Sequence, residues 1–115
     1  MRIELDRERH YRERGDILRV LKEDYQRDLT SARNLVGVLD ALGLPLSEED
    51  LAFHLIYLSD QGYLRVLRVR DMPSYRKDRR LPGWEKPETI KFVKLMPKGL
   101  QLIDGLIEED PGVKF

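Results

Sequence analysis

Residues 47–64 read Ser-Glu-Glu-Asp-Leu-Ala-Phe-His-Leu-Ile-Tyr-Leu-Ser-Asp-Gln-Gly-Tyr-Leu, and this stretch decides the fold. Ser47 followed by Asp50 is typical of a capped helix start, where acids in the first turn suit the positive end of the helix dipole. Gly62 is a natural helix end. The apolar residues recur at helical spacing and define one buried face: Leu51, Leu55 and Leu58.

The opposite face of this helix carries side chains that a DNA groove does not favour. It falls on Glu49, Phe53, Ile56 and Asp60, and the whole stretch holds four acids and no Lys or Arg. Helices that enter the major groove present basic or amide side chains to bases and need basic neighbours at the phosphates. Two large apolar residues facing outward predict a cover, formed either by the chain's own termini or by a second subunit. The candidate protein-interface residues are Glu49, Phe53, Ile56, Tyr57 and Asp60.

The acids at the start of this helix have a simpler explanation. Glu48 and Asp50 occupy positions where a carboxylate caps the first turn, and capping alone accounts for them as well as a role in excluding DNA does.

A first helix is expected from about Asp6 to Glu23, with a buried stripe in its second half. Gly15 weakens it by about 1 kcal/mol relative to Ala. The stable part is therefore expected to begin near Asp16, which leaves the charged stretch 1–14 as an extension in solvent or against a partner. The stripe is formed by Ile17, Leu18, Val20 and Leu21.

A second helix is expected after Thr30 or Ser31, either of which can cap it, and Gly43 is expected to end it. A last helix is predicted from Pro97 to Asp110-Pro111-Gly112, followed by a short tail, 110–115. The apolar positions are Leu35, Val38, Leu39 and Leu42 in the second helix, and Leu100, Leu102, Ile103, Leu106 and Ile107 in the last.

Two antiparallel strands are predicted at 63–70 and 90–96, which are rich in β-branched and aliphatic residues. Their alternation slips between Val66 and Leu67 and between Phe92 and Val93. Such a slip indicates either a bulge or a strand covered on both faces. The connection 72–89 is long and Pro-rich, as expected of a functional loop.

Charge is sorted along the chain, although its 115 residues sum to zero. Residues 65–98 hold eleven basic and four acidic side chains, with Tyr75 and Trp84 among them. Basic residues interleaved with aromatics suit phosphate contact and base stacking. Basic residues at a sheet edge also prevent aggregation, and Trp84 can simply anchor a long loop. The candidate DNA-binding residues are Arg65, Arg68, Arg70, Arg76, Lys77, Arg79, Arg80 and Lys91, with Lys94 nearby.

The order helix, helix, helix, hairpin, helix, together with Leu-x-x-x-Leu-x-x-Leu-x-x-x-Gly-Tyr-Leu at 51–64 and Leu-Met-Pro-Lys-Gly at 95–99, resembles the winged helix-turn-helix superfamily. The carboxyl end, Lys-Gly-Leu-x-x-Ile-x-Gly followed by Pro-Gly-Val-Lys, is similar to small winged-helix proteins of Mu-like prophages. The resemblance implies one α+β winged-helix domain over 1–115, with a three-helix core, a two-stranded wing whose loop is 72–89, and a C-terminal helix. Met96 departs from the Thr or Ser that commonly caps the last helix.

Several classes of function find little support in the sequence. With no cysteine and with His10 and His54 as its two histidines, the chain offers no recognisable nucleophile, metal spacing or phosphate loop, and we expect no enzyme, no metal and no cofactor. His54 lies beside the buried face and is expected to be packed or to face a partner. No stretch approaches the roughly 20 apolar residues of a membrane span, so a cytoplasmic protein without membrane contact is expected.

Two functions are therefore compatible with the sequence. The first is a phage or prophage-encoded transcription regulator that binds double-stranded DNA mainly through its basic wing. The alternative is a winged-helix module that does not bind DNA and uses its third helix for dimerisation, or for contact with a phage or host protein.

Overall fold

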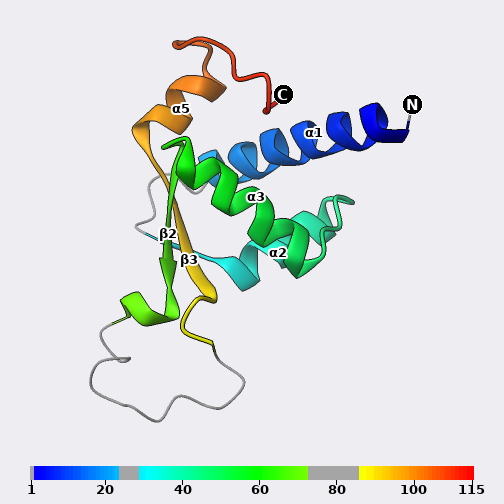
Figure 1. Ribbon diagram of the computed structural model, residues 1–115. Coiled ribbons are helices and arrows are strands. Elements are labelled where there is room, and N and C mark those ends of the chain that lie inside the picture. The colour runs from blue at the N-terminus through cyan, green and yellow to red at the C-terminus, as the bar shows by residue number, and fades with distance from the viewer. Residues whose placement is uncertain (1, 24–28, 73–85) are drawn as a thin grey trace.

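The computed structural model describes residues 2–23, 29–72 and 86–115 (Figure 1). Within them the chain forms four α-helices and a small antiparallel sheet, which confirms the α+β class. One end of the hairpin lies beside the helices, and its other end extends beyond them. The elements are α1 (Arg2–Glu23), β1 (Thr30–Ser31), α2 (Ala32–Ala41), α3 (Glu48–Asp60), β2 (Leu64–Arg68), the 3-10 turn η1 (Val69–Asp71), β3 (Ile90–Leu95) and α5 (Pro97–Ile103).

The core lies where α1, α2 and α3 meet the sheet. The predicted leucines of α3 are all buried, and Ser47 caps the helix by accepting a hydrogen bond from the Asp50 amide at 3.1 Å. Burying an aliphatic side chain contributes about 1.5–3 kcal/mol, so this contiguous cluster is the main stabilising feature of the fold. It includes Ile17, Leu18, Leu21, Leu35, Leu39, Leu51, Leu55, Leu58, Leu64, Val93 and Leu95.

The sheet has three strands in the order β1-β3-β2, not the two that the sequence predicted. The extra strand is Thr30–Ser31, too short for a periodicity signal, and it pairs with β3 directly before Ser31 caps α2. Between β2 and β3 the register shifts, because Leu67 pairs with Phe92 whereas Arg68 pairs with Ile90. The hairpin therefore contains a bulge, but it lies one residue beyond the predicted slips, because Val66 and Leu67 pair in regular register with Val93 and Phe92.

Helix α1 is continuous through Gly15, so the expectation that its stable part begins near Asp16 is wrong. The physical reason is a close approach of the C-terminal tail. A Cβ on Gly15 would lie 1.9 Å from the Lys114 carbonyl oxygen. The glycine thus lets two backbones meet, and packing in the folded molecule outweighs its poor helix propensity.

Two predicted apolar faces are narrower than expected. In α2, Leu35 and Leu39 are buried, but Val38 is exposed, and so is Leu42 at the C-cap. Helix α5 ends at Ile103 instead of running to Asp110, because Gly105 adopts a positive φ of 72°. The Leu106 amide then donates to the Gln101 carbonyl at 2.8 Å, and the Leu106 side chain is 73% exposed.

None of the helices in the described part of the chain has the length and hydrophobicity of a membrane span.

Candidate functional site

The outer face of α3 points away from the core, as its periodicity predicted, but the described parts of the chain's own termini leave it largely exposed, so they do not form the expected cover. Phe53 is 55% exposed and Ile56 is 41% exposed, and Glu49 and Asp60 are exposed on either side of them. Tyr57 differs from these four, because it is half-buried and its hydroxyl donates to Asp110 Oδ1 at 3.1 Å. The face therefore consists of an apolar pair between two acids.

The described part of the hairpin carries the opposite charge. Arg65 on β2 lies directly opposite Lys94 on β3, and both side chains are exposed. Arg70 is exposed as well. Arg68 is half-buried and donates to the Glu88 carbonyl at 3.1 Å, so it also braces the two arms of the hairpin.

The remaining candidate DNA contacts divide into two groups. Lys91 is half-buried beside the bulge, and its side chain is not free, because it interacts with other groups of the protein. Four of the predicted wing residues lie outside the described residues: Arg76, Lys77, Arg79 and Arg80.

A pocket of about 660 Å³ lies between α2, α3 and the hairpin. Its walls include Leu51 and Leu55, and its charged lining residues are Arg33, Glu48 and Lys91. The Glu48 carboxylate belongs to the first turn of α3, where a phosphate group would otherwise meet free backbone amides. The acid thus makes this end of α3 a poor phosphate site.

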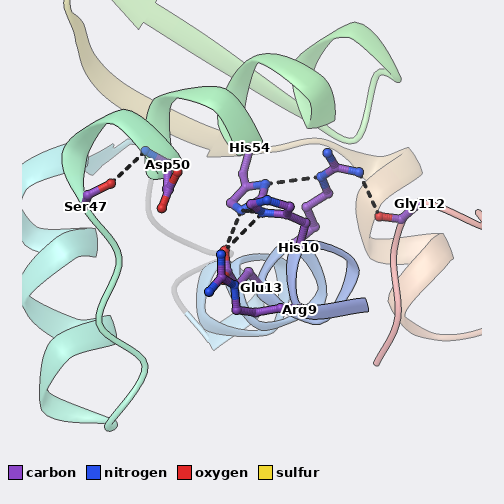
Figure 2. Close-up of polar contacts among 8 residues, drawn as sticks. Arg9, His10, Glu13, Ser47, Asp50, His54 and Gly112 are labelled. Atoms are coloured by element: carbon purple, nitrogen blue, oxygen red, sulfur yellow. Dashed lines mark hydrogen bonds and ion pairs between the residues drawn. The ribbon is translucent and has the colours of Figure 1, made fainter. Parts of the chain in front are cut away.

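A second arrangement, which the sequence did not predict, joins α1, α3 and the C-terminal tail (Figure 2). His54 is fully buried, and its Nε2 lies 2.7 Å from Glu13 Oε2. Its Nδ1 lies 3.2 Å from Arg14 Nε, and Arg14 Nη1 donates to the Gly112 carbonyl at 3.1 Å. Arg14 is 6% exposed, and its guanidinium carbon lies 3.8 Å from the centre of the Tyr57 ring.

The protonation state of His54 follows from its two partners. The Arg14 guanidinium always carries its protons, so Nδ1 must accept and the ring proton must sit on Nε2, from which it donates to Glu13. Burial lowers the pKa of His54; hydrogen bonding and charge from Glu13 oppose this, and the Arg14 charge reinforces it. His54 is thus held neutral.

Three side chains here could in principle hold a metal ion: His10, Glu13 and His54. Their donor atoms lie 3.4 Å (His10 to His54), 2.7 Å (His54 to Glu13) and 3.6 Å (His10 to Glu13) apart. A point about 1.9 Å from all three exists, which is near the usual bond lengths of zinc. A neutral histidine that ligates through Nε2 must, however, carry its proton on Nδ1, where Arg14 already points an N–H. The arrangement therefore favours the network over a metal centre.

The tail is seated by further polar contacts. Asp110 accepts hydrogen bonds from the Tyr57 and Tyr63 hydroxyls, the latter at 2.7 Å, and from the Gly112 amide. Burial and the bonded Asp110 carboxylate raise the pKa of both tyrosines. The Lys114 amide donates to the Tyr11 carbonyl at 3.0 Å, and Val113 is buried.

Sequence reasoning missed Glu13, Arg14 and Asp110 as members of one network. One signal was present, since a glycine in the middle of a helix indicates a close backbone approach, and Gly15 marks where the tail crosses α1. Comparisons with protein-family models, curated proteins and solved structures found no match to the chain.

Proposed function

We propose that this chain is a winged-helix protein that binds double-stranded DNA through the hairpin β2–β3 and the connection 72–89, and not through α3. The order of elements supports the winged-helix assignment, because α2 and α3 are followed by a hairpin whose second arm also pairs with the short β1. Fold alone does not imply function, so the proposal depends on the charges that these elements carry.

The observation that carries the proposal is the cross-strand pair of Arg65 and Lys94. Like charges directly opposite each other destabilise an antiparallel pair, and an anionic ligand removes that penalty. Counting the described hairpin residues 64–72 and 86–95, six side chains are basic and two are acidic, and one of these acids, Asp71, is occupied by the Arg68 amide. Such an excess of positive charge fits a phosphate backbone.

Helix α3 presents no comparable positive charge to DNA. Its exposed face holds Glu49, Phe53, Ile56 and Asp60, and three carboxylates occupy its first turn. A carboxylate can accept from cytosine, but only when basic residues hold the protein in register, and α3 itself contains no Lys or Arg. Binding through the hairpin would thus be sensitive to salt and weakly selective for sequence.

A fluorescence-anisotropy titration with a random duplex at low salt tests the proposal. Replacing Arg65 and Lys94 together with Ala should weaken binding roughly tenfold and reduce the log-log salt slope by about 2, one unit for each lost phosphate contact. Arg7→Ala with Arg12→Ala is the matched control, since it removes the same charge from exposed positions of α1. Absence of binding by the wild type at low salt, or equal losses in both variants, would refute the proposal.

A role as a phage or prophage transcription regulator extends this proposal. It rests on the similarity of the carboxyl end to winged-helix proteins of Mu-like prophages. A cytoplasmic location fits the absence of cysteine and the need to meet DNA.

A second candidate function is protein contact through α3, which the exposure of Phe53 and Ile56 favours. Phe53→Glu with Ile56→Glu should convert any self-associated form to a monomer in sedimentation analysis, because charge in an apolar contact is costly. Val38→Glu with Leu42→Glu is the control, since it charges two exposed apolar residues, one in α2 and one at its C-cap. A monomeric wild type at high concentration would exclude the homodimer and leave a phage or host protein as the partner.

A further inference from the structure

We propose that His54 and Arg14 form a proton-sensitive latch on the C-terminal tail, residues 110–115, which holds the tail while His54 is neutral and releases it when His54 takes up a proton. The latch requires neither DNA binding nor a partner on α3. It rests on the buried contacts that link α3 to the tail through one guanidinium.

Arg14 is the mechanical link. Its Nε donates to His54 Nδ1, its Nη1 donates to the Gly112 carbonyl, and its plane lies over the Tyr57 ring. A buried cation is tolerated only when its donors find acceptors, so the positions of the histidine and of the tail carbonyl are coupled through it.

The charged and titratable groups around His54 come from α1, from α3 and from the tail. From α1 they are His10, Glu13 and Arg14. From α3 itself there is Tyr57, whose hydroxyl is bonded to Asp110 of the tail. Farther out, the Lys114 ammonium pairs with Glu8 at 2.9 Å, and the same contact lowers the pKa of Glu8.

A second proton on the His54 ring can bind only at Nδ1. Nε2 already carries a proton toward Glu13, so the added proton occupies Nδ1 and faces the Arg14 N–H. The Arg14–His54 hydrogen bond is lost, and two cations then share a buried site. Glu13 stabilises the added charge but gains no new hydrogen bond from it. Withdrawal of Arg14 relieves the repulsion and removes its bond to Gly112.

Release of the tail would change the surface beside α3. The guanidinium carbon of Arg14 lies 5.6 Å from the centre of the exposed Phe53 ring and 3.8 Å from that of Tyr57. Lifting the tail uncovers Val113, Gly15 and the Tyr57 ring, so the apolar face that contains Phe53 would grow on acidification.

Amide hydrogen exchange and histidine NMR on the intact chain test the latch together. As the pH falls from about 7.5 to about 5, the protection factor of the Lys114 amide should fall roughly tenfold, in step with the titration of the His54 ring resonances. The Val69 amide, which donates to Thr89 in the hairpin, should keep its protection.

Two variants separate His54 from its neighbours. In His54→Asn the Oδ1 atom can still accept from Arg14 but does not titrate, so protection of the Lys114 amide should become independent of pH in this range. In His10→Asn the fall should persist. Constant protection in the wild type through the His54 titration, an equal fall in His54→Asn, or loss of the fall in His10→Asn would each overturn the proposal. If His54→Asn fails to fold, the wild-type comparison decides alone.

Discussion

Gly15 shows how one residue can oppose local propensity in favour of tertiary structure. In an isolated helix it would be replaced by Ala with a gain of about 1 kcal/mol. Here the Lys114 carbonyl occupies the space of a Cβ. Its neighbour Arg14 donates to the Gly112 carbonyl, so positions 14 and 15 both contact the tail.

Gly15→Ala should therefore destabilise the fold by about 1–3 kcal/mol, the usual range for overpacking, and reduce protection of the Lys114 amide. Gly37→Ala is the matched control, because Gly37 lies within α2 and a Cβ added there would meet nothing within 4 Å, so it should stabilise by about 0.5–1 kcal/mol. Urea unfolding measures both changes. Stabilisation by both substitutions would show that the tail does not press on α1.

The Nδ1 lone pair of His54 leads to a second prediction for single residues. Wild-type protein should show no shift of its His10 and His54 ring resonances with equimolar Zn²⁺, because Arg14 blocks the tautomer that a metal needs. Arg14→Gln removes the obligatory donor, and its side-chain oxygen can accept a proton from Nδ1, so this variant should gain zinc affinity. Strong binding by the wild type would show that the tautomer assignment is wrong.

At the scale of elements, α3 and α2 begin with serine caps of different quality. Ser47 Oγ accepts from the Asp50 amide at 3.1 Å, whereas Ser31 Oγ accepts from the Asn34 amide at 3.4 Å. Ser47→Ala should therefore cost about 1 kcal/mol and Ser31→Ala less, as measured by thermal unfolding. The reverse order would mean that the strand contact of Ser31 matters more than its cap.

Elements with a strong repeating pattern were predictable, and those set by distant contacts were not. The leucines of α3 follow from helical periodicity, and the strand pair 64–68 with 90–95 follows from its content of β-branched and aliphatic residues. The two-residue β1 is too short to show a period, and the early end of α5 depends on the positive φ of Gly105. Exposure of Val38 and Leu42 depends on what packs against α2, which spacing alone does not reveal.

The same distinction separates the features of the candidate site that the sequence predicted from those that it did not. The outward position of Phe53 and Ile56 followed from the helical phase of α3. The buried network joins residues that lie 40 or more positions apart in the sequence: Glu13, Arg14, His54 and the tail. No local sequence motif therefore predicts it. The sequence predicted that His54 is packed or faces a partner; the structure shows it packed, with hydrogen-bond partners that the sequence did not predict.

At the scale of the whole molecule, stability should depend on pH through His54. Its pKa in the folded chain lies below the ordinary 6.5 because the ring is buried, so the unfolded chain binds the proton first as the pH falls. The free energy of unfolding should therefore be highest above that ordinary value and decline as the pH drops toward the folded pKa. Urea unfolding across this range should show the decline in the wild type and a weaker one in His54→Asn.

The separation of charge between α3 and the hairpin is the central feature of the molecule, and chemical-shift mapping with a short duplex tests it most directly. At low salt, added DNA should shift the amides of β2 and β3 around Arg65 and Lys94 and leave those of α3 between Glu49 and Asp60 in place. Shifts concentrated on α3, with the hairpin unaffected, would contradict binding through the hairpin.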